Sequence, residues 1–255
     1  MKKVSALLKR CCIVTLITVL AFSGLTVAAP QTQAATASRT TVTLAKGTTY
    51  ATPLYIIDSG KPGPVVMIVG GVHGNETAGY TAAGKVKDWS IKKGKLLVLP
   101  QANKKAVARH TRTYNGDLNR DFPQSSTQSA DNTLSRAIYA AVKKYDVDWL
   151  MDMHEGYNYA KISKSVGQSL IYYPNSTTKT MANAIVKNLN GGISTSYKKF
   201  SLFRYPVKGS LARAAGQYLG VHAFIFETCD NPSLSVRVNY QLKAANTLLS
   251  RLGMR

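Results

Sequence analysis

Two short segments of the chain place histidine and glutamate where they could hold a metal ion. In GGVHGNE (residues 70–76), His73 and Glu76 stand three positions apart, directly after an apolar run. In MDMHEG (residues 151–156), His154 ends a second apolar run. The first pair alone is a weak signal for a metal site, because chance supplies many such pairs and a polar turn also explains it. Together, two imidazoles and one carboxylate with an open fourth position form a catalytic zinc set, so we expect one Zn²⁺ per chain.

The segment YNGDLNRDFP (residues 114–123) contains groups suited to binding a carboxylate. Asn119 and Arg120 lie in its crowded polar stretch, between the apolar Leu118 and Phe122. Such a stretch could simply be a solvated turn held by its own side chains. Beside a metal site, however, an arginine offers a planar pair of donors that matches a carboxylate.

A further candidate is Glu227, which follows four apolar residues in AFIFE (residues 223–227). A carboxylate in such surroundings is costly unless it is paired or has a function. We therefore expect Glu227 to act in the same site, with a strand-end salt bridge as the alternative.

The elements that must position these residues alternate between apolar strands and amphipathic helices. Strands rich in Val, Ile and Leu, separated by helices, predict an α/β sandwich around a mixed, mostly parallel sheet. Ligands of such sheets bind beyond the carboxyl ends of the strands, and His73, His154 and Glu227 each follow a predicted strand closely. The predicted strands are residues 65–69, 95–100, 147–153, 169–173 and 223–226, the predicted helices are 77–89, 129–145, 177–189 and 235–252, and 101–128 is predicted to be a long loop.

Residues 1–37 have the pattern of a secretory signal peptide followed by a small-residue leader. Four basic residues precede an apolar stretch, and Ala, Thr, Ser and Gln follow it. An uncleaved membrane anchor is the alternative, since about 19 apolar residues can span a bilayer. We predict cleavage, which leaves residues 38–255 as a single catalytic domain, secreted or associated with the cell envelope. Cys229 is then the only cysteine left, so no internal disulfide is expected.

The chain is strongly basic. Its 33 Lys and Arg residues against 12 Asp and Glu give +21, and loss of the four basic residues of the leader reduces this to +17. Such a surplus favours anionic partners, including anionic cell-wall polymers. Export and the lack of any RNA-binding or Cys/His finger pattern argue against nucleic acid. A non-catalytic exported protein that binds anionic cell-wall polymers is the alternative to an enzyme, and we expect a monomer.

Four motifs in this order, GGVHGNE, DLNRDFP, MDMHEG and FIFET, resemble the zinc carboxypeptidase superfamily, most closely its succinylglutamate desuccinylase/aspartoacylase branch. The resemblance covers about residues 64 to 252. It implies a three-layer α/β sandwich, a bound zinc ion and hydrolysis of an amide bond. One departure is that only a helix is predicted after Glu227, where aspartoacylase-like proteins carry a further β-rich domain.

The resemblance also implies roles for single residues. His73, Glu76 and His154 would be the zinc ligands, and Glu227 would move protons between the attacking water and the leaving nitrogen. Arg112 would polarise the scissile carbonyl. The remaining positions would bind substrate, with Asn119 and Arg120 on a substrate carboxylate. Tyr205 would stand at the place of a mobile tyrosine, with an ordinary loop aromatic as the alternative. Arg213 would lie in a pocket wall and select an acidic group, with a position on a helix surface as the alternative.

The roles of the two carboxylates near His154 are not decided by the sequence. Either Asp152 or Glu155 could accept a hydrogen bond from a ligand imidazole, and the sequence does not decide between them. The resulting expectation is a secreted zinc-dependent amide hydrolase. Its substrate would be a carboxylate-bearing peptide or acyl-amino acid, such as a cell-wall stem peptide.

Overall fold

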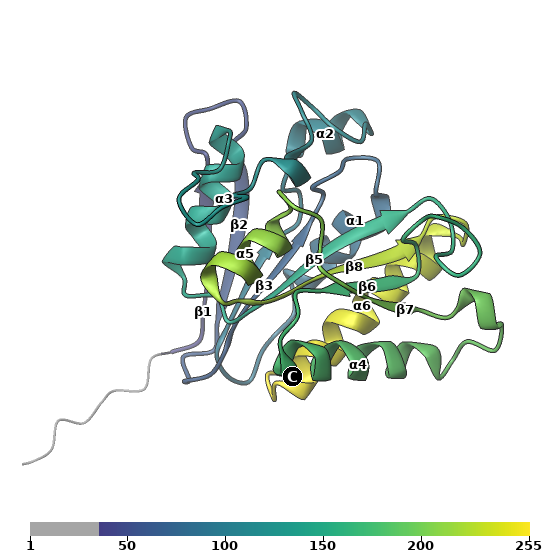
Figure 1. The fold of residues 1–255 in the computed structure, drawn as a ribbon. Coiled ribbons are helices and arrows are strands. Elements are labelled where there is room, and N and C mark those ends of the chain that lie inside the picture. The colour runs from purple at the N-terminus through teal and green to yellow at the C-terminus, as the bar shows by residue number, and fades with distance from the viewer. Residues whose placement is uncertain (1–35) are drawn as a thin grey trace, which may run out of the picture. The chain divides into compact units, whose positions relative to one another are not determined.

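A computed structural model describes residues 36–255, which form an eight-stranded mixed sheet between two layers of helices (Figure 1). The strand order is β1-β2-β4-β3-β5-β8-β6-β7. The central pairs β4–β3, β3–β5 and β5–β8 are parallel, whereas β1–β2, β2–β4 and β8–β6 are antiparallel. The elements are β1 Ser38–Leu44, β2 Thr52–Asp58, β3 Val65–Gly70, α1 Thr77–Val86, β4 Lys95–Leu99, α2 Lys104–Arg109, η1 Leu118–Arg120, α3 Thr133–Lys144, β5 Trp149–Gly156, β6 Ser169–Tyr172, α4 Ser176–Asn190, η2 Ser196–Lys198, β7 Ser201–Arg204, α5 Leu211–Leu219, β8 His222–Cys229 and α6 Leu234–Arg251.

The two faces of the sheet carry separate hydrophobic clusters. Helices α1, α4 and α6 pack on one face, through residues such as Ala82, Ile185 and Leu248. Helices α3 and α5 pack on the other, through residues such as Ile138 and Leu211. The three-layer α/β prediction with a mixed, mostly parallel sheet is therefore confirmed.

The central elements are where the sequence pattern predicts them, but several peripheral ones are not. Strand β1 was not expected, because it is largely exposed and polar and has no apolar run. Strand β2 was missed although it contains the apolar residues Tyr55, Ile56 and Ile57. The loop predicted for residues 101–128 is wrong in part, since it contains α2 and η1. Strand β7 and helix α5 were also missed. Helix α3 begins at Thr133, four residues later than predicted, because the Asn132 side chain caps it.

The predicted signal peptide falls almost entirely on residues 1–35, which lie outside the described residues. Among residues 36–255, no helix combines the length and the apolar character needed to cross a membrane. Cys229 is buried and is not in a disulfide in this part of the chain.

Candidate active site

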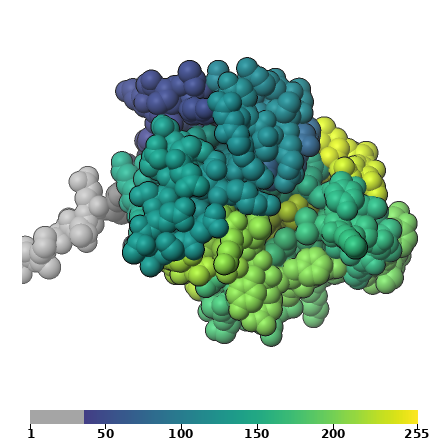
Figure 2. Space-filling view, turned by 45° about the horizontal axis from the view of Figure 1, so that its top comes forward, coloured from purple at the N-terminus to yellow at the C-terminus, as the bar shows by residue number. Residues whose placement is uncertain are grey.

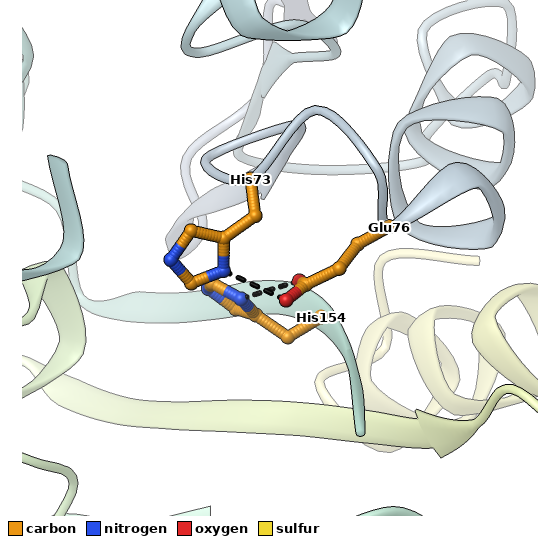
Figure 3. Close-up of side chains that lie close together, drawn as sticks. All are labelled: His73, Glu76 and His154. Atoms are coloured by element: carbon orange, nitrogen blue, oxygen red, sulfur yellow. Dashed lines mark hydrogen bonds and ion pairs between the residues drawn. The ribbon is translucent and has the colours of Figure 1, made fainter. Parts of the chain in front are cut away.

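Three potential metal ligands converge at the carboxyl ends of β3 and β5 (Figure 3). His73 lies in the loop after β3, Glu76 is the N-cap residue of α1, and His154 lies near the end of β5. One ligand atom from each of them falls within 4.8 Å of the others, and all three side chains are buried. The sheet therefore brings together the residues that the sequence placed after separate strands.

Both imidazoles turn the same ring nitrogen toward the glutamate. His73 Nδ1 lies 2.7 Å from Glu76 Oε1, and His154 Nδ1 lies 2.8 Å from Glu76 Oε2. Burial alone raises the pKa of Glu76, but the two histidines bring that pKa well below its ordinary value. Two imidazole nitrogens and a carboxylate therefore surround one point, and together they can bind a cation.

The opposite ring nitrogen of each histidine faces an aspartate. His73 Nε2 lies 2.9 Å from Asp117 Oδ1, and this hydrogen bond lowers the pKa of Asp117 to about 2. His154 Nε2 lies 3.1 Å from Asp152 Oδ2, although the pair does not have hydrogen-bond alignment. Carboxylates in this position orient metal-binding imidazoles. Of the two residues that the sequence left open, Asp152 is the one beside the His154 ring.

This arrangement fits zinc. Two imidazole nitrogens and a carboxylate are the donor set of a catalytic zinc site. The pKa of His154 is set by three effects: burial would lower it, but Asp152 and Glu76 raise it well above the ordinary value. A buried imidazole placed between two carboxylates is therefore stabilised as a cation, and a metal ion held by His154 would supply the same positive charge.

Two glycines allow the elements to approach closely enough to form the site. A Cβ on Gly74 would lie 2.0 Å from the backbone carbon of Ala106 in α2. A Cβ on Gly79 would lie 2.4 Å from the carbonyl oxygen of Met153, so a larger residue would push α1 away from β5. Glu76 and His154 meet because α1 lies this close to the strand.

Glu155 holds Glu76 and the start of α1 in position through hydrogen bonds. Its backbone N–H donates to Glu76 Oε2 at 3.1 Å, and its carboxylate accepts from the Ala78 N–H at 2.7 Å and from Arg237 Nη1 at 2.6 Å. Gln241 donates to the carbonyl oxygen of His154 at 2.8 Å. Sequence reasoning missed Arg237 and Gln241, both on α6.

Glu227 lies beside the ligands on the neighbouring strand. It pairs with His154 in the β5–β8 register and is 7% exposed, and its Oε2 has no hydrogen-bond partner among residues 36–255. Burial is the main reason that the pKa of Glu227 is raised to about 8. A buried carboxyl that titrates near neutral pH can act as a general acid and base.

One cavity of about 880 Å³ is lined by the three potential metal ligands together with Glu155 and Glu227. Figure 2 shows this face of the molecule, which is hollowed between a teal lobe and a green lobe. Arg112, Asn119, Arg120 and Tyr205, four of the residues predicted to act on the substrate, also line it. Arg112 Nη1 donates to Glu76 Oε1 at 2.9 Å, and its side chain is 51% exposed.

The structure does not place Arg213 in the wall of this cavity. Its guanidinium donates to Gln217 Oε1 at 2.6 Å and to the carbonyl oxygen of Pro206 at 3.2 Å. It also lies over the rings of Tyr173 and Tyr205, 5.7 and 5.1 Å from their centres. Arg213 is therefore held by α5 and by the loop that carries Tyr205, and it is not among the residues that line the cavity.

The fold and the site together place a buried His–Glu–His cation site at the edge of an α/β sandwich. Residues 62–191 match the succinylglutamate desuccinylase/aspartoacylase catalytic domain, and the chain belongs to this family. The comparison with curated proteins gave no match.

Solved structures share the fold at low sequence identity. The mDAP-bound form of the D,L-carboxypeptidase Csd4 from Helicobacter pylori is 22% identical with a TM-score of 0.64, and the match covers 76% of this chain and 52% of that one. A succinylglutamate desuccinylase/aspartoacylase from Rhodobacter sphaeroides is 19% identical (TM-score 0.61; 86% and 65% covered). The ectoine utilization protein EutE (DoeB) from Ruegeria pomeroyi is 17% identical (TM-score 0.63; 89% and 71% covered). The chain thus spans about half the length of the Csd4 structures that it matches.

Proposed function

We propose that this protein is an exported zinc-dependent peptidase that cleaves an amide bond near a free carboxylate, with a cell-wall stem peptide as substrate. The observation that carries the proposal is the cavity in which Glu227, Arg112, Asn119 and Arg120 surround the zinc ligands. Zinc, when bound, polarises a carbonyl and lowers the pKa of water.

The protein side chains supply proton transfer and charge stabilisation. Glu227 takes a proton from the attacking water and passes it to the leaving nitrogen, for which a pKa near the working pH is suited. Arg112, half exposed beside Glu76, stabilises negative charge on the carbonyl oxygen as it develops. Removal of either group should therefore lower turnover without unfolding the site.

Asn119 and Arg120 hold the carboxylate of the substrate. The Asn119 side chain is buried, and its NH2 group is the part that can donate to a carboxylate. Arg120 is 46% exposed, and its Nη1 donates to the backbone carbonyl oxygen of Asn119 at 2.8 Å. A planar guanidinium next to an amide is suited to bind a carboxylate through several hydrogen bonds.

The size of the cavity favours a peptide over a small acyl-amino acid. A volume of about 880 Å³ lies near the upper end of the range for small-molecule pockets. Csd4, a D,L-carboxypeptidase, has been solved with mDAP and with a tripeptide, which supports a stem peptide here. The basic charge of the chain and the predicted export fit an anionic cell wall as its working place.

The test is a panel of substrates incubated with the zinc-loaded protein and read by mass spectrometry. It contains peptides and muropeptides with a free C-terminal carboxylate, the same peptides as C-terminal amides, and N-acyl amino acids. We expect cleavage of the free-carboxylate peptides and none by the His73→Ala protein. Equal cleavage of the C-terminal amides would contradict the binding of a substrate carboxylate by Asn119 and Arg120. Cleavage of the N-acyl amino acids alone would contradict the assignment of a peptide substrate.

A further inference from the structure

An apolar strip begins beside Glu227 and crosses three strands. Side chains alternate along a strand, so Ile225 and Glu227 leave β8 on the same face. Ile225 pairs with Ile171 of the antiparallel strand β6. Ile171 in turn pairs with Phe203 of β7, which runs parallel to β6. All three apolar residues line the cavity. We call Ile225, Ile171 and Phe203 the apolar floor.

The apolar floor lies next to the reacting bond. Two residues along a strand are separated by about 7 Å, so Ile225 begins within one side-chain length of Glu227. The far end of the floor is open, since Phe203 is 38% exposed although it is a large hydrophobic residue. Tyr205 and Val207 continue the apolar surface at the rim, and both line the same cavity.

Two basic residues, Arg204 and Lys164, also line the cavity. Arg204 follows Phe203 directly, so alternation turns its Cβ to the opposite face of β7, and its guanidinium lies over the Tyr205 ring, 5.3 Å from the ring centre. Arg213 is held by Gln217 and Pro206. The side chains of the apolar floor itself carry no hydrogen-bond donor, so a carboxylate in contact with them would lose water without gaining a partner from these three residues.

We propose that the apolar floor binds an aliphatic side chain of the residue next to the scissile amide and disfavours an acidic one. This inference rests on the proposed function, because it requires the substrate to lie in this cavity. It assigns Ile171, Ile225 and Phe203 to specificity, in place of the acidic preference that Arg213 would have given.

The test measures binding separately from turnover. The zinc-loaded Glu227→Gln protein is titrated by calorimetry with N-acetyl-norleucine, N-acetyl-glutamine and N-acetyl-glutamate, each in its L and D form. Each buried methylene strengthens binding about fourfold, so we expect norleucine to bind at least about tenfold more tightly than glutamate. In Ile171→Arg the order should reverse in favour of glutamate. The matched control is Ile162→Arg, at an exposed isoleucine outside the cavity lining, which should keep the original order.

Two results would overturn the proposal: tighter binding of glutamate in the parent protein, or an unchanged order in Ile171→Arg. If Ile171→Arg does not fold, Phe203→Ser serves instead, with weaker norleucine binding and unchanged glutamate binding expected. Norleucine preference without hydrolysis of any substrate would refute the proposed function alone. Hydrolysis with a preference for glutamate would refute the apolar floor alone.

Discussion

The contact between Arg237 and Glu155 allows a quantitative prediction about the support of the metal ligands. The Glu155 side chain is 3% exposed and that of Arg237 is 17% exposed, and their closest atoms are 2.6 Å apart. Breaking a buried pair by removing one partner costs about 3 to 5 kcal/mol. Because Arg237 keeps some contact with solvent, we expect Arg237→Met to lower the free energy of unfolding by about 3 kcal/mol, a large part of the usual stability of a domain.

The penalty should depend on pH in a defined direction. Burial raises the pKa of Glu155, an effect that the Ala78 N–H and Arg237 partly offset. Without Arg237 this pKa rises further, so the folded protein holds the Glu155 proton more tightly than the unfolded chain does. Such a group destabilises the folded state above its pKa and ceases to do so once it is protonated. The loss in Arg237→Met should therefore be largest near about pH 8 and shrink toward about pH 5.

The assay is urea unfolding of the zinc-free parent and variant at both pH values. Arg136→Met is a matched control, since Arg136 of α3 donates to the backbone carbonyls of Ala130 and Asp131, and its loss should be small and independent of pH. Adding Glu155→Gln to Arg237→Met should recover part of the stability because it removes the unpaired charge. An equal loss at both pH values, or no recovery in the double variant, would refute the reasoning.

Three further predictions concern zinc and turnover. Glu227→Gln should keep the fold and one equivalent of zinc by metal analysis while turnover falls by about 10²- to 10⁴-fold; turnover within a few-fold of the parent would contradict the role of Glu227. Asp117→Asn should weaken zinc binding by about 10- to 100-fold in chelator competition, because it changes the acceptor of His73 Nε2. An unchanged zinc affinity would contradict the role of Asp117 in orienting the His73 ring. Zinc affinity should rise with pH through the raised pKa of His154, because the ion must displace a proton, and a flat profile between about pH 6 and 9 would show that no proton is released.

The metal centre was predictable because its residues sit at the ends of apolar strands. β3 and β8 contain continuous apolar runs, β5 is apolar up to Met153 except at Asp152, and parallel strands bring their carboxyl ends to one edge of the sheet. The support for the ligands was not predictable in the same way. Arg237 and Glu155 are 82 residues apart, and nothing in the local sequence of α6 shows that one of its basic residues is buried. The position of Arg213 likewise depends on how α5 packs against the sheet, and sequence spacing does not give this.

The apolar floor shows most clearly where the pattern of a sequence stops being informative. Ile225 can be placed on the face of Glu227 by alternation alone, but the strands beside it are apolar on both faces. Leu170 and Phe226 pack into the cluster under α4 and α6, while Ile171 and Ile225 face the side of α5. A one-residue change in the β6 register would exchange these sets, and either set looks equally hydrophobic in the sequence. The antiparallel pairing of β6 with β8 is what turns Ile171 toward the cavity. Substrate preference therefore depends on a strand register, and an Ile171 variant can test it even though the residue has no reactive group.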